Sequence, residues 1–256
     1  MCAEQKNSPN APAFVENSDG LCYNKILVES MTLLDIVNNS RRIVFFGGAG
    51  VSTESGIPDF RSADGLYRQK YDVPPEVMLS ATYFYSHTEK FFEFYREEVL
   101  KHRGEPNVVY QTLARMEQDG KLIGVVSRSI FALSERAGCR NVVDIHGNIY
   151  QNICPRCGRT YDYRYILEHT PVPYCEDCRA VVRPQIVLTG EMVSNDKVTR
   201  ATELVSTMQS YLTKSFIKYF NGSKVVLVNW AEHYSDVKAD GVCIGNLLEI
   251  VPKIYP

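Results

Sequence analysis

Four of the eight cysteines stand in two C-x-x-C pairs, Cys154/Cys157 and Cys175/Cys178, with seventeen residues between the pairs. This spacing is typical of zinc modules in which four thiolates bind Zn²⁺ tetrahedrally. A set of four cysteines leaves no open position for a catalytic water, so the zinc is expected to be structural. The alternative is a redox pair or a chance spacing.

A glycine-rich turn provides a second candidate site. The apolar run 43–46 leads directly into Gly47-Gly48-Ala49-Gly50. Small residues after a strand let backbone N–H groups approach a diphosphate, and the N-terminus of a following helix favours its negative charge. A tight strand–helix connection that binds nothing is the alternative.

His146 is the third candidate, because it ends the apolar stretch 141–146. In open α/β sheets, ligands bind at the carboxyl ends of the parallel strands. That position predicts an active-site histidine. A hydrogen-bonded histidine at a strand end, with no role in chemistry, is the alternative.

The elements that must position these residues alternate along the chain. Apolar runs predict strands over 43–46, 122–127 and 141–146, and helical spacing of apolar residues predicts helices over 24–39, 76–101 and 107–119. This alternation favours an α/β fold with a doubly wound parallel sheet. The cysteine-containing stretch 148–182 interrupts the sheet, which residues 183–188 are expected to resume.

The run GVSTESGIPDFRSADGLY at 50–67, with His146-Gly147 and the four cysteines, resembles the sirtuin family. The resemblance covers about residues 25–192 and resumes at about 216–250. It implies a Rossmann-like NAD-binding domain and a smaller domain made of a zinc ribbon and helices. On this basis we predict, in chain order, a flexible tail (1–24), the NAD-binding domain (25–147 and 183–256, with 64–105 giving helices to the small domain) and the zinc-ribbon insert (148–182).

The resemblance also implies an activity, namely NAD-dependent removal of acyl groups from protein lysines, with NAD and zinc as cofactors and an acyl-lysine protein or peptide as partner. In the family the acyl oxygen attacks C1′ of the nicotinamide ribose, nicotinamide leaves, and a histidine acts as general base on the ribose hydroxyls. His146 matches that histidine, and Gly190-Glu191 matches the strand that pairs with substrate peptide.

Further positions match cofactor-binding residues of the family. The diphosphate residues correspond to Gly48, Ala49, Gly50 and Thr53. The mobile loop over the cofactor corresponds to Asp59, Phe60 and Arg61, and the contact to the adenosine ribose corresponds to Asn229. Arg128 stands where the family has a ribose-contacting glutamine.

One segment departs from the family pattern. Where sirtuins read T-Q-N-I-D-G-L-H, this chain reads S-R-S-I-F-A-L-S at residues 127–134. Ser129 replaces the asparagine that holds the nicotinamide ribose and its water, and Phe131 replaces the aspartate of the nicotinamide pocket. A ring in place of a carboxylate changes both volume and hydrogen bonding.

A second departure lies between Gly190 and Val225, where the chain is roughly ten residues shorter than the family. Apolar residues keep helical spacing throughout 196–220. We therefore predict one nearly continuous helix there, in place of the family's strand ending in Gly-Thr-Ser.

Two functional hypotheses follow. The chain is either a working NAD-dependent deacylase, or a catalytically impaired relative that binds NAD or ADP-ribose or acts as a scaffold. A hydride-transferring dehydrogenase fits the bare glycine turn but not the cysteine quartet.

Composition limits the partners and the location. A formal net charge of -2 predicts no general attraction to nucleic acid or to anionic membranes. No apolar run approaches the ~18–20 residues that a membrane-spanning helix needs, and the polar N-terminus shows no secretory signal. With paired cysteines typical of a reducing compartment, we expect a cytoplasmic protein.

Overall fold

The computed structural model describes residues 14–16, 22–24, 33–58, 71–206, 224–229 and 239–255. These residues fall into two compact units. The first takes in the described parts of Met1–Phe45, Asn107–Gly124 and Thr202–Pro256, and the second takes in those of Phe46–Pro106 and Val125–Ala201.

One parallel sheet has the strand order β3-β4-β5. Its strands are β3 (Ile43–Gly47), β4 (Leu122–Ser127) and β5 (Val142–Asp144). Val125 lies opposite Val142, and Ser127 lies opposite Asp144. The continuous apolar character of β4 and β5 suits strands that are buried on both faces. The predicted strands are confirmed, except that β5 ends at Asp144 and not at His146.

The first unit holds a second small sheet with the order β1-β2-β10-β9. Strands β9 (Val226–Asn229) and β10 (Gly241–Ile244) are parallel, and β2 (Cys22–Asn24) adds to β10 in the antiparallel sense. Strand β1 (Phe14–Glu16) pairs with β2. Both strands lie within residues 1–24, which were predicted to be a flexible tail. They are ordered as strands because the free edge of β10 gives β2 a partner.

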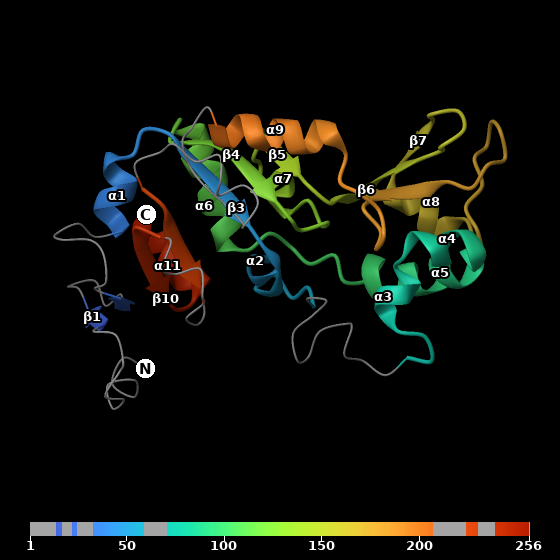
Figure 1. Cartoon of the computed structure of the whole chain (residues 1–256), viewed down its shortest axis with the longest axis horizontal. Helices are drawn as coiled ribbons and strands as arrows, with labels where there is room; N and C mark the ends of the chain where they lie inside the picture. Colours follow the sequence, from blue (N-terminus) through green and yellow to red (C-terminus); the bar gives the residue numbers. More distant parts are fainter. Residues whose placement is uncertain are drawn as a thin grey trace. The chain divides into compact units, whose positions relative to one another are not determined.

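Three helices pack together in the first unit. Helix α11 (Leu247–Ile254) packs against α6 (Val108–Gln118) and α1 (Leu33–Asn39), as Figure 1 shows. Asn107 caps α6 by accepting the N–H of Val109 at 3.0 Å. Helix α6 confirms the prediction over 107–119. Helix α1 confirms the end of the helix predicted over 24–39, whose residues 25–32 lie outside the described residues.

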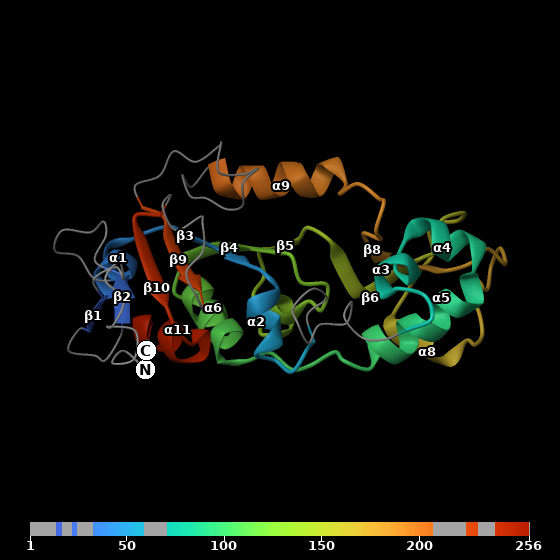
Figure 2. The ribbon, with the colours of Figure 1, turned by 60° about the horizontal axis from the view of Figure 1, so that its bottom comes forward.

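The second unit contains an antiparallel sheet with the order β7-β6-β8, beside a cluster of helices (Figures 1 and 2). The strands are β6 (Gly147–Ile153), β7 (Thr160–Tyr161) and β8 (Arg183–Ile186). The prediction that residues 183–188 resume the parallel sheet is wrong. Arg183 lies opposite Ile153 in an antiparallel pair, because the open side of β6 offers β8 its hydrogen-bonding partner.

The region predicted to be helical over 76–101 consists of several short helices. They are α3 (Pro75–Met78), α4 (Ala81–Ser86), α5 (Thr88–Phe94) and the π-helical turn η3 (Tyr95–Leu100). Ser80 interrupts the run and caps α4 by accepting the N–H of Tyr83 at 3.1 Å. Phe91, Phe92 and Tyr95 are fully buried and form the centre of this cluster, together with α8 (Tyr163–Glu168).

Helix α9 (Asn195–Ser206) begins the region where the chain departs from the family pattern. The predicted helix over 196–220 is confirmed as far as Ser206, and no strand interrupts residues 195–206. Residues 207–223 lie outside the described residues. Within the described ranges, no helix is long and apolar enough to cross a bilayer.

Candidate functional site

The carboxyl ends of three adjacent parallel strands meet at one edge of the sheet. The N–H of Arg128, just after β4, donates to the carbonyl oxygen of Gly47 at the end of β3, at 3.0 Å. The N–H of Ile145, just after β5, donates to the carbonyl oxygen of Ser127 at 2.9 Å. The glycine turn, the segment after β4 and His146 therefore emerge at the edge where open α/β sheets bind ligands.

The glycine turn is open where a ligand would lie. Helix α2 (Ala49–Thr53) starts directly after Gly48, whose φ of -103° is accessible to any residue. The glycines are therefore not required by backbone angle. Among the described residues, and apart from its own chain neighbours, no atom lies within 4 Å of a Cβ built on Gly48 or Gly50. The missing side chains leave room for a diphosphate close to the backbone N–H groups, so the turn fits the nucleotide cofactor.

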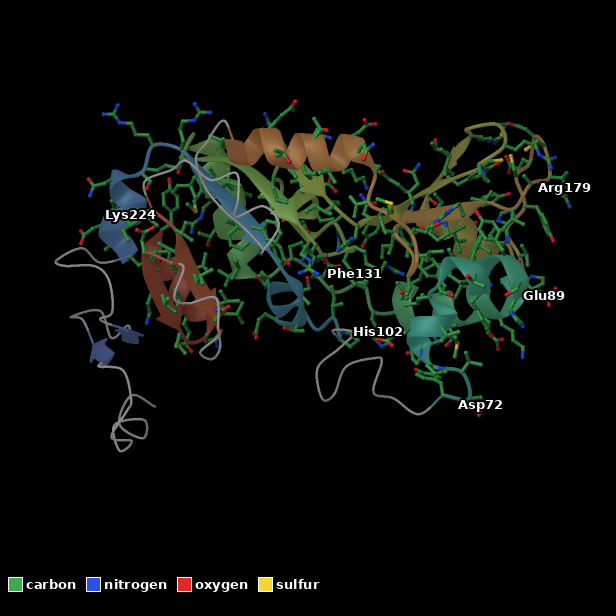
Figure 3. The ribbon with its side chains drawn as sticks, in the orientation of Figure 1. Asp72, Glu89, His102, Phe131, Arg179 and Lys224 are labelled. Carbon is green, nitrogen blue, oxygen red and sulfur yellow. The ribbon has the colours of Figure 1, made fainter. Side chains whose placement is uncertain are left out.

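The segment after β4 folds into a tight buried turn. The N–H of Ser129 donates to Ser127 Oγ at 3.1 Å, and the N–H of Phe131 donates to Ser129 Oγ at 3.4 Å. The Ser129 hydroxyl thus helps to hold its own turn. Phe131 is only 4% exposed and is labelled in Figure 3. Its ring belongs to the core of the turn.

Ala132 continues this turn in a left-handed conformation, with φ of 49° and ψ of 34°. It immediately precedes helix α7 (Leu133–Arg136). A side chain in this region costs free energy that glycine does not. The glycine of the family pattern has its counterpart at this position, so the alanine introduces backbone strain next to Phe131.

His146 is half-buried between β5 and β6. Its carbonyl oxygen accepts the N–H of Val187 at 2.9 Å. The next residue, Gly147, has φ of 77°, and a Cβ there would lie 1.8 Å from the carbonyl oxygen of Gln185. Only glycine allows this close approach of two backbones. The His-Gly pair is therefore fixed between the end of β5 and the continuation of β8.

A buried carboxyl group two residues before His146 is a candidate site residue that the sequence analysis missed. Asp144 is 8% exposed, and its Oδ2 accepts a hydrogen bond from Asn148 Nδ2 at 3.3 Å. Burial, and then the nearby Glu135 carboxyl, raise the pKa of Asp144 to about 7. The available signal was an aspartate inside the apolar run NVVDIH.

Charged groups surround this carboxyl from two helices. Burial also raises the pKa of Glu135 on α7. The positive charge of Lys197 on α9 opposes the rise in the pKa of both carboxyl groups, and Arg200 opposes it for Glu135, but burial outweighs both. Burial lowers the pKa of Lys197 itself. Helix α9, from the region where the chain departs from the family, therefore supplies positive charge to the carboxyl pair.

The four paired cysteines form one cluster, as predicted. Their Sγ atoms all lie within 4.8 Å of one another, with 3.3 Å between Cys154 and Cys178 and 3.5 Å between Cys157 and Cys175. A tetrahedral zinc with ~2.3 Å Zn–S bonds has S···S edges of about 3.8 Å. The residues present therefore fit a closed structural zinc site.

Neighbouring groups support thiolate ligands and hold the two pairs together. Burial raises the pKa of Cys175, but hydrogen bonds from the Tyr161 hydroxyl and from backbone N–H groups outweigh it and lower that pKa to about 6. Arg159, beside the first pair, forms ion pairs with Glu176 and Asp177 in the second. Arg179, labelled in Figure 3, follows Cys178 at the same end of the unit.

The other predicted cofactor-binding residues lie on several elements. Thr53 ends α2, and its hydroxyl donates to the carbonyl oxygen of Gly50 at 3.1 Å. The Arg128 side chain is exposed. Asn229 ends β9 in the first unit. Asp59, Phe60 and Arg61 lie outside the described residues.

Known proteins resemble this chain over most of its length. A profile of the Sir2 family matches residues 48–213. An NAD-dependent protein deacetylase of Clostridium acetobutylicum is 41% identical over 235 residues, covering 86% of this chain and 96% of the relative. A second one, from Clostridium tetani, is 39% identical and covers 84% and 94%.

Solved sirtuin structures resemble this chain in fold as well. A structure described under the structural basis of sirtuin substrate affinity superposes with a TM-score of 0.77 at 30% identity, covering 89% of this chain and 98% of the other. The predicted Rossmann-like fold with a zinc-ribbon and helical module is confirmed by this likeness and by the cysteine cluster.

Proposed function

Because this chain belongs to the Sir2 family, the sirtuins, we propose that it is an NAD-dependent protein-lysine deacylase that transfers the acyl group to ADP-ribose and releases nicotinamide. The observation that carries this proposal is the meeting of three strand ends at one sheet edge. It brings an open glycine turn and His146 to adjoining strand ends through the hydrogen bonds of Arg128 and Ile145.

Each predicted residue has a part in this proposal. The N–H groups of the Gly48–Gly50 turn would hold the diphosphate, with Thr53 beside them, and the Arg128 guanidinium would face the cofactor from the next strand. Asn229 would contact the adenosine ribose, and Asp59, Phe60 and Arg61 would cover the cofactor. When bound, NAD supplies a glycosidic bond at C1′ whose cleavage releases nicotinamide.

His146 would act as the general base of the reaction. A neutral imidazole can take a proton from a ribose hydroxyl. The rigid backbone around Gly147 would hold the imidazole at the sheet edge. The zinc cluster would stabilise the β6–β8 sheet that continues from His146, without taking part in the chemistry.

The acyl-lysine partner would add as an extended strand at Gly190-Glu191. The preceding Val187 is tied to His146, whose carbonyl oxygen accepts its N–H. A peptide there would therefore run close to the catalytic base. The paired cysteines also favour a reducing compartment, and we place the protein in the cytoplasm.

The segment 127–134 favours a second candidate, an impaired deacylase that binds NAD or ADP-ribose. The Ser129 hydroxyl accepts the N–H of Phe131, and the buried Phe131 ring has no carboxylate to offer. Groups that act only in the transition state can each contribute several kcal/mol, on the order of 3 kcal/mol for one hydrogen-bond donor. Their replacement would slow turnover by orders of magnitude while leaving the adenosine half of the cofactor bound.

Mass spectrometry of an acetyl-lysine peptide pool, incubated with the protein with and without NAD, tests the proposal. NAD-dependent conversion to unmodified lysine peptides and O-acetyl-ADP-ribose is the expected result. Calorimetric binding of ADP-ribose without any conversion would favour the second candidate. Neither binding nor conversion would refute both.

A further inference from the structure

A compact turn follows strand β8, and a side chain holds it from within. The N–H of Glu191 donates to the carbonyl oxygen of Leu188 at 2.9 Å, and Gly190 has φ of 93°. A positive φ at the third position is the requirement of a type II turn. The N–H of Leu188 donates in turn to Glu191 Oε2 at 2.9 Å. Glu191 therefore closes the turn through both its backbone and its carboxylate.

The same carboxylate forms a two-point ion pair with Arg183 on β8. Arg183 Nη1 lies 2.8 Å from Glu191 Oε1, and Nη2 lies 2.9 Å from Oε2. The side chains are 18% and 25% exposed, and the Arg183 guanidinium holds the pKa of Glu191 below its usual value. Paired bonds of this kind fix orientation as well as distance.

Arg183 is itself held in place. Its guanidinium carbon lies 5.6 Å from the centroid of the Phe84 ring on α4, within cation–π range. Its Nη2 also donates to the carbonyl oxygen of Ile186 at 3.4 Å. One guanidinium group therefore links the turn to helix α4 and to β8.

Backbone hydrogen bonds connect the residues before the turn to neighbours on both sides. The N–H of Thr189 donates to the carbonyl oxygen of Leu79 at 3.0 Å, and the N–H of Ala81 donates to that of Thr189 at 3.1 Å. On the other side, Val187 is bonded to the carbonyl of His146 at 2.9 Å. A shift of the turn would move the segment beside which the peptide is proposed to lie.

Stability alone is a weak reason for such a pair, because apolar residues of similar volume often replace a buried ion pair at no cost in stability. Resting on the proposed function, we infer that Glu191 and Arg183 are positioning residues for the protein substrate. They hold the turn at residues 188–191 in the geometry that presents Gly190-Glu191 to an extended acyl-lysine peptide. We expect NAD binding at the Gly48–Gly50 turn to be independent of them.

Steady-state kinetics of Glu191→Gln and Arg183→Lys, with peptide and NAD varied separately, test the inference. Both variants keep a polar partner but lose the two-point ion pair. We expect the KM for peptide to rise roughly tenfold, with the KM for NAD and the zinc content unchanged. Glu97→Gln, which removes an exposed carboxylate paired with Lys101, is the control and leaves both constants unchanged.

The double variant Arg183→Met/Glu191→Leu separates positioning from stability. It replaces the ion pair by apolar side chains and leaves the Leu188 N–H without its acceptor. A raised KM for peptide at a wild-type Tm supports the inference. An unchanged KM for peptide, or an equal rise in the KM for NAD, overturns it. If the wild-type protein shows no turnover, the proposed function itself fails, and binding of the acetyl-lysine peptide, measured by fluorescence anisotropy across the same variants, decides the inference separately.

Discussion

Asn148 donates one hydrogen bond to the buried carboxyl of Asp144, at 3.3 Å, while Asp144 Oδ1 has no hydrogen-bond partner among the described residues. For an ionised carboxylate in this position, Asn148 and Lys197 offset only part of the cost of burial and of the nearby Glu135 carboxyl. The pKa of Asp144 is accordingly raised to about 7, so the carboxyl group keeps its proton up to neutral pH.

This arrangement predicts that stability falls as the pH rises. The native state keeps a proton on Asp144 between the unfolded-state pKa of 3.8 and the native-state pKa of about 7, so the free energy of unfolding decreases across that window. Three pKa units correspond to about 4 kcal/mol. Asp144→Asn should weaken this dependence, leaving the part that Glu135 contributes, and it should stabilise the protein relative to wild type at pH 8 more than at pH 4.

Urea unfolding at a series of pH values measures the effect. Asp72→Asn changes an exposed aspartate and serves as the control, with a pH profile parallel to that of the wild type. Parallel profiles for Asp144→Asn and the wild type would contradict the assigned burial of the charge.

The left-handed conformation of Ala132 predicts that Ala132→Gly stabilises the protein. The conformation costs alanine ~1–2 kcal/mol, and the extra freedom of glycine in the unfolded chain takes back ~0.4–1 kcal/mol, which leaves a gain of about 0.5–1 kcal/mol. Ala137→Gly, at a right-handed position with φ of -76° at the end of the same helix, should instead lose stability. Thermal unfolding compares the two, and a loss in both variants would show that Ala132 is not strained.

The cysteine cluster predicts one zinc per chain. Cys157→Ser should lose the metal and, with it, the order of the β7-β6-β8 sheet, because the folding of such modules depends on metal binding. Cys139→Ser alters a buried cysteine outside the cluster and should retain zinc. Elemental analysis with thermal unfolding in the presence of EDTA tests this. Folded protein with well under one zinc per chain would contradict it.

Much of the site could be predicted because its signals are local. The C-x-x-C pairs, the glycine turn after β3 and the His-Gly pair each lie within a few residues, and the structure places them as the sequence indicated. Strand β4 was predicted at its exact bounds because a continuous apolar run has one plausible role in a parallel sheet.

The errors concern partners distant in sequence. Residues 183–186 form a strand as predicted, but their partner is β6, and a strand pattern does not say which edge it joins. The strands β1 and β2 depend in the same way on the edge of β10. The burial of Asp144 and its relation to Lys197 on α9 arise only after β5, α7 and α9 pack together.

Nicotinamide release from NAD, measured with an acetyl-lysine peptide pool for the wild-type protein and for His146→Ala, tests the central claim most directly. Both proteins should first be shown to contain equal zinc, so that the comparison reports on the base and not on folding. We expect release by the wild type that falls by at least about 100-fold without His146, the usual contribution of a general base. No release by zinc-loaded wild-type protein, or release that is equal in the variant, would contradict it.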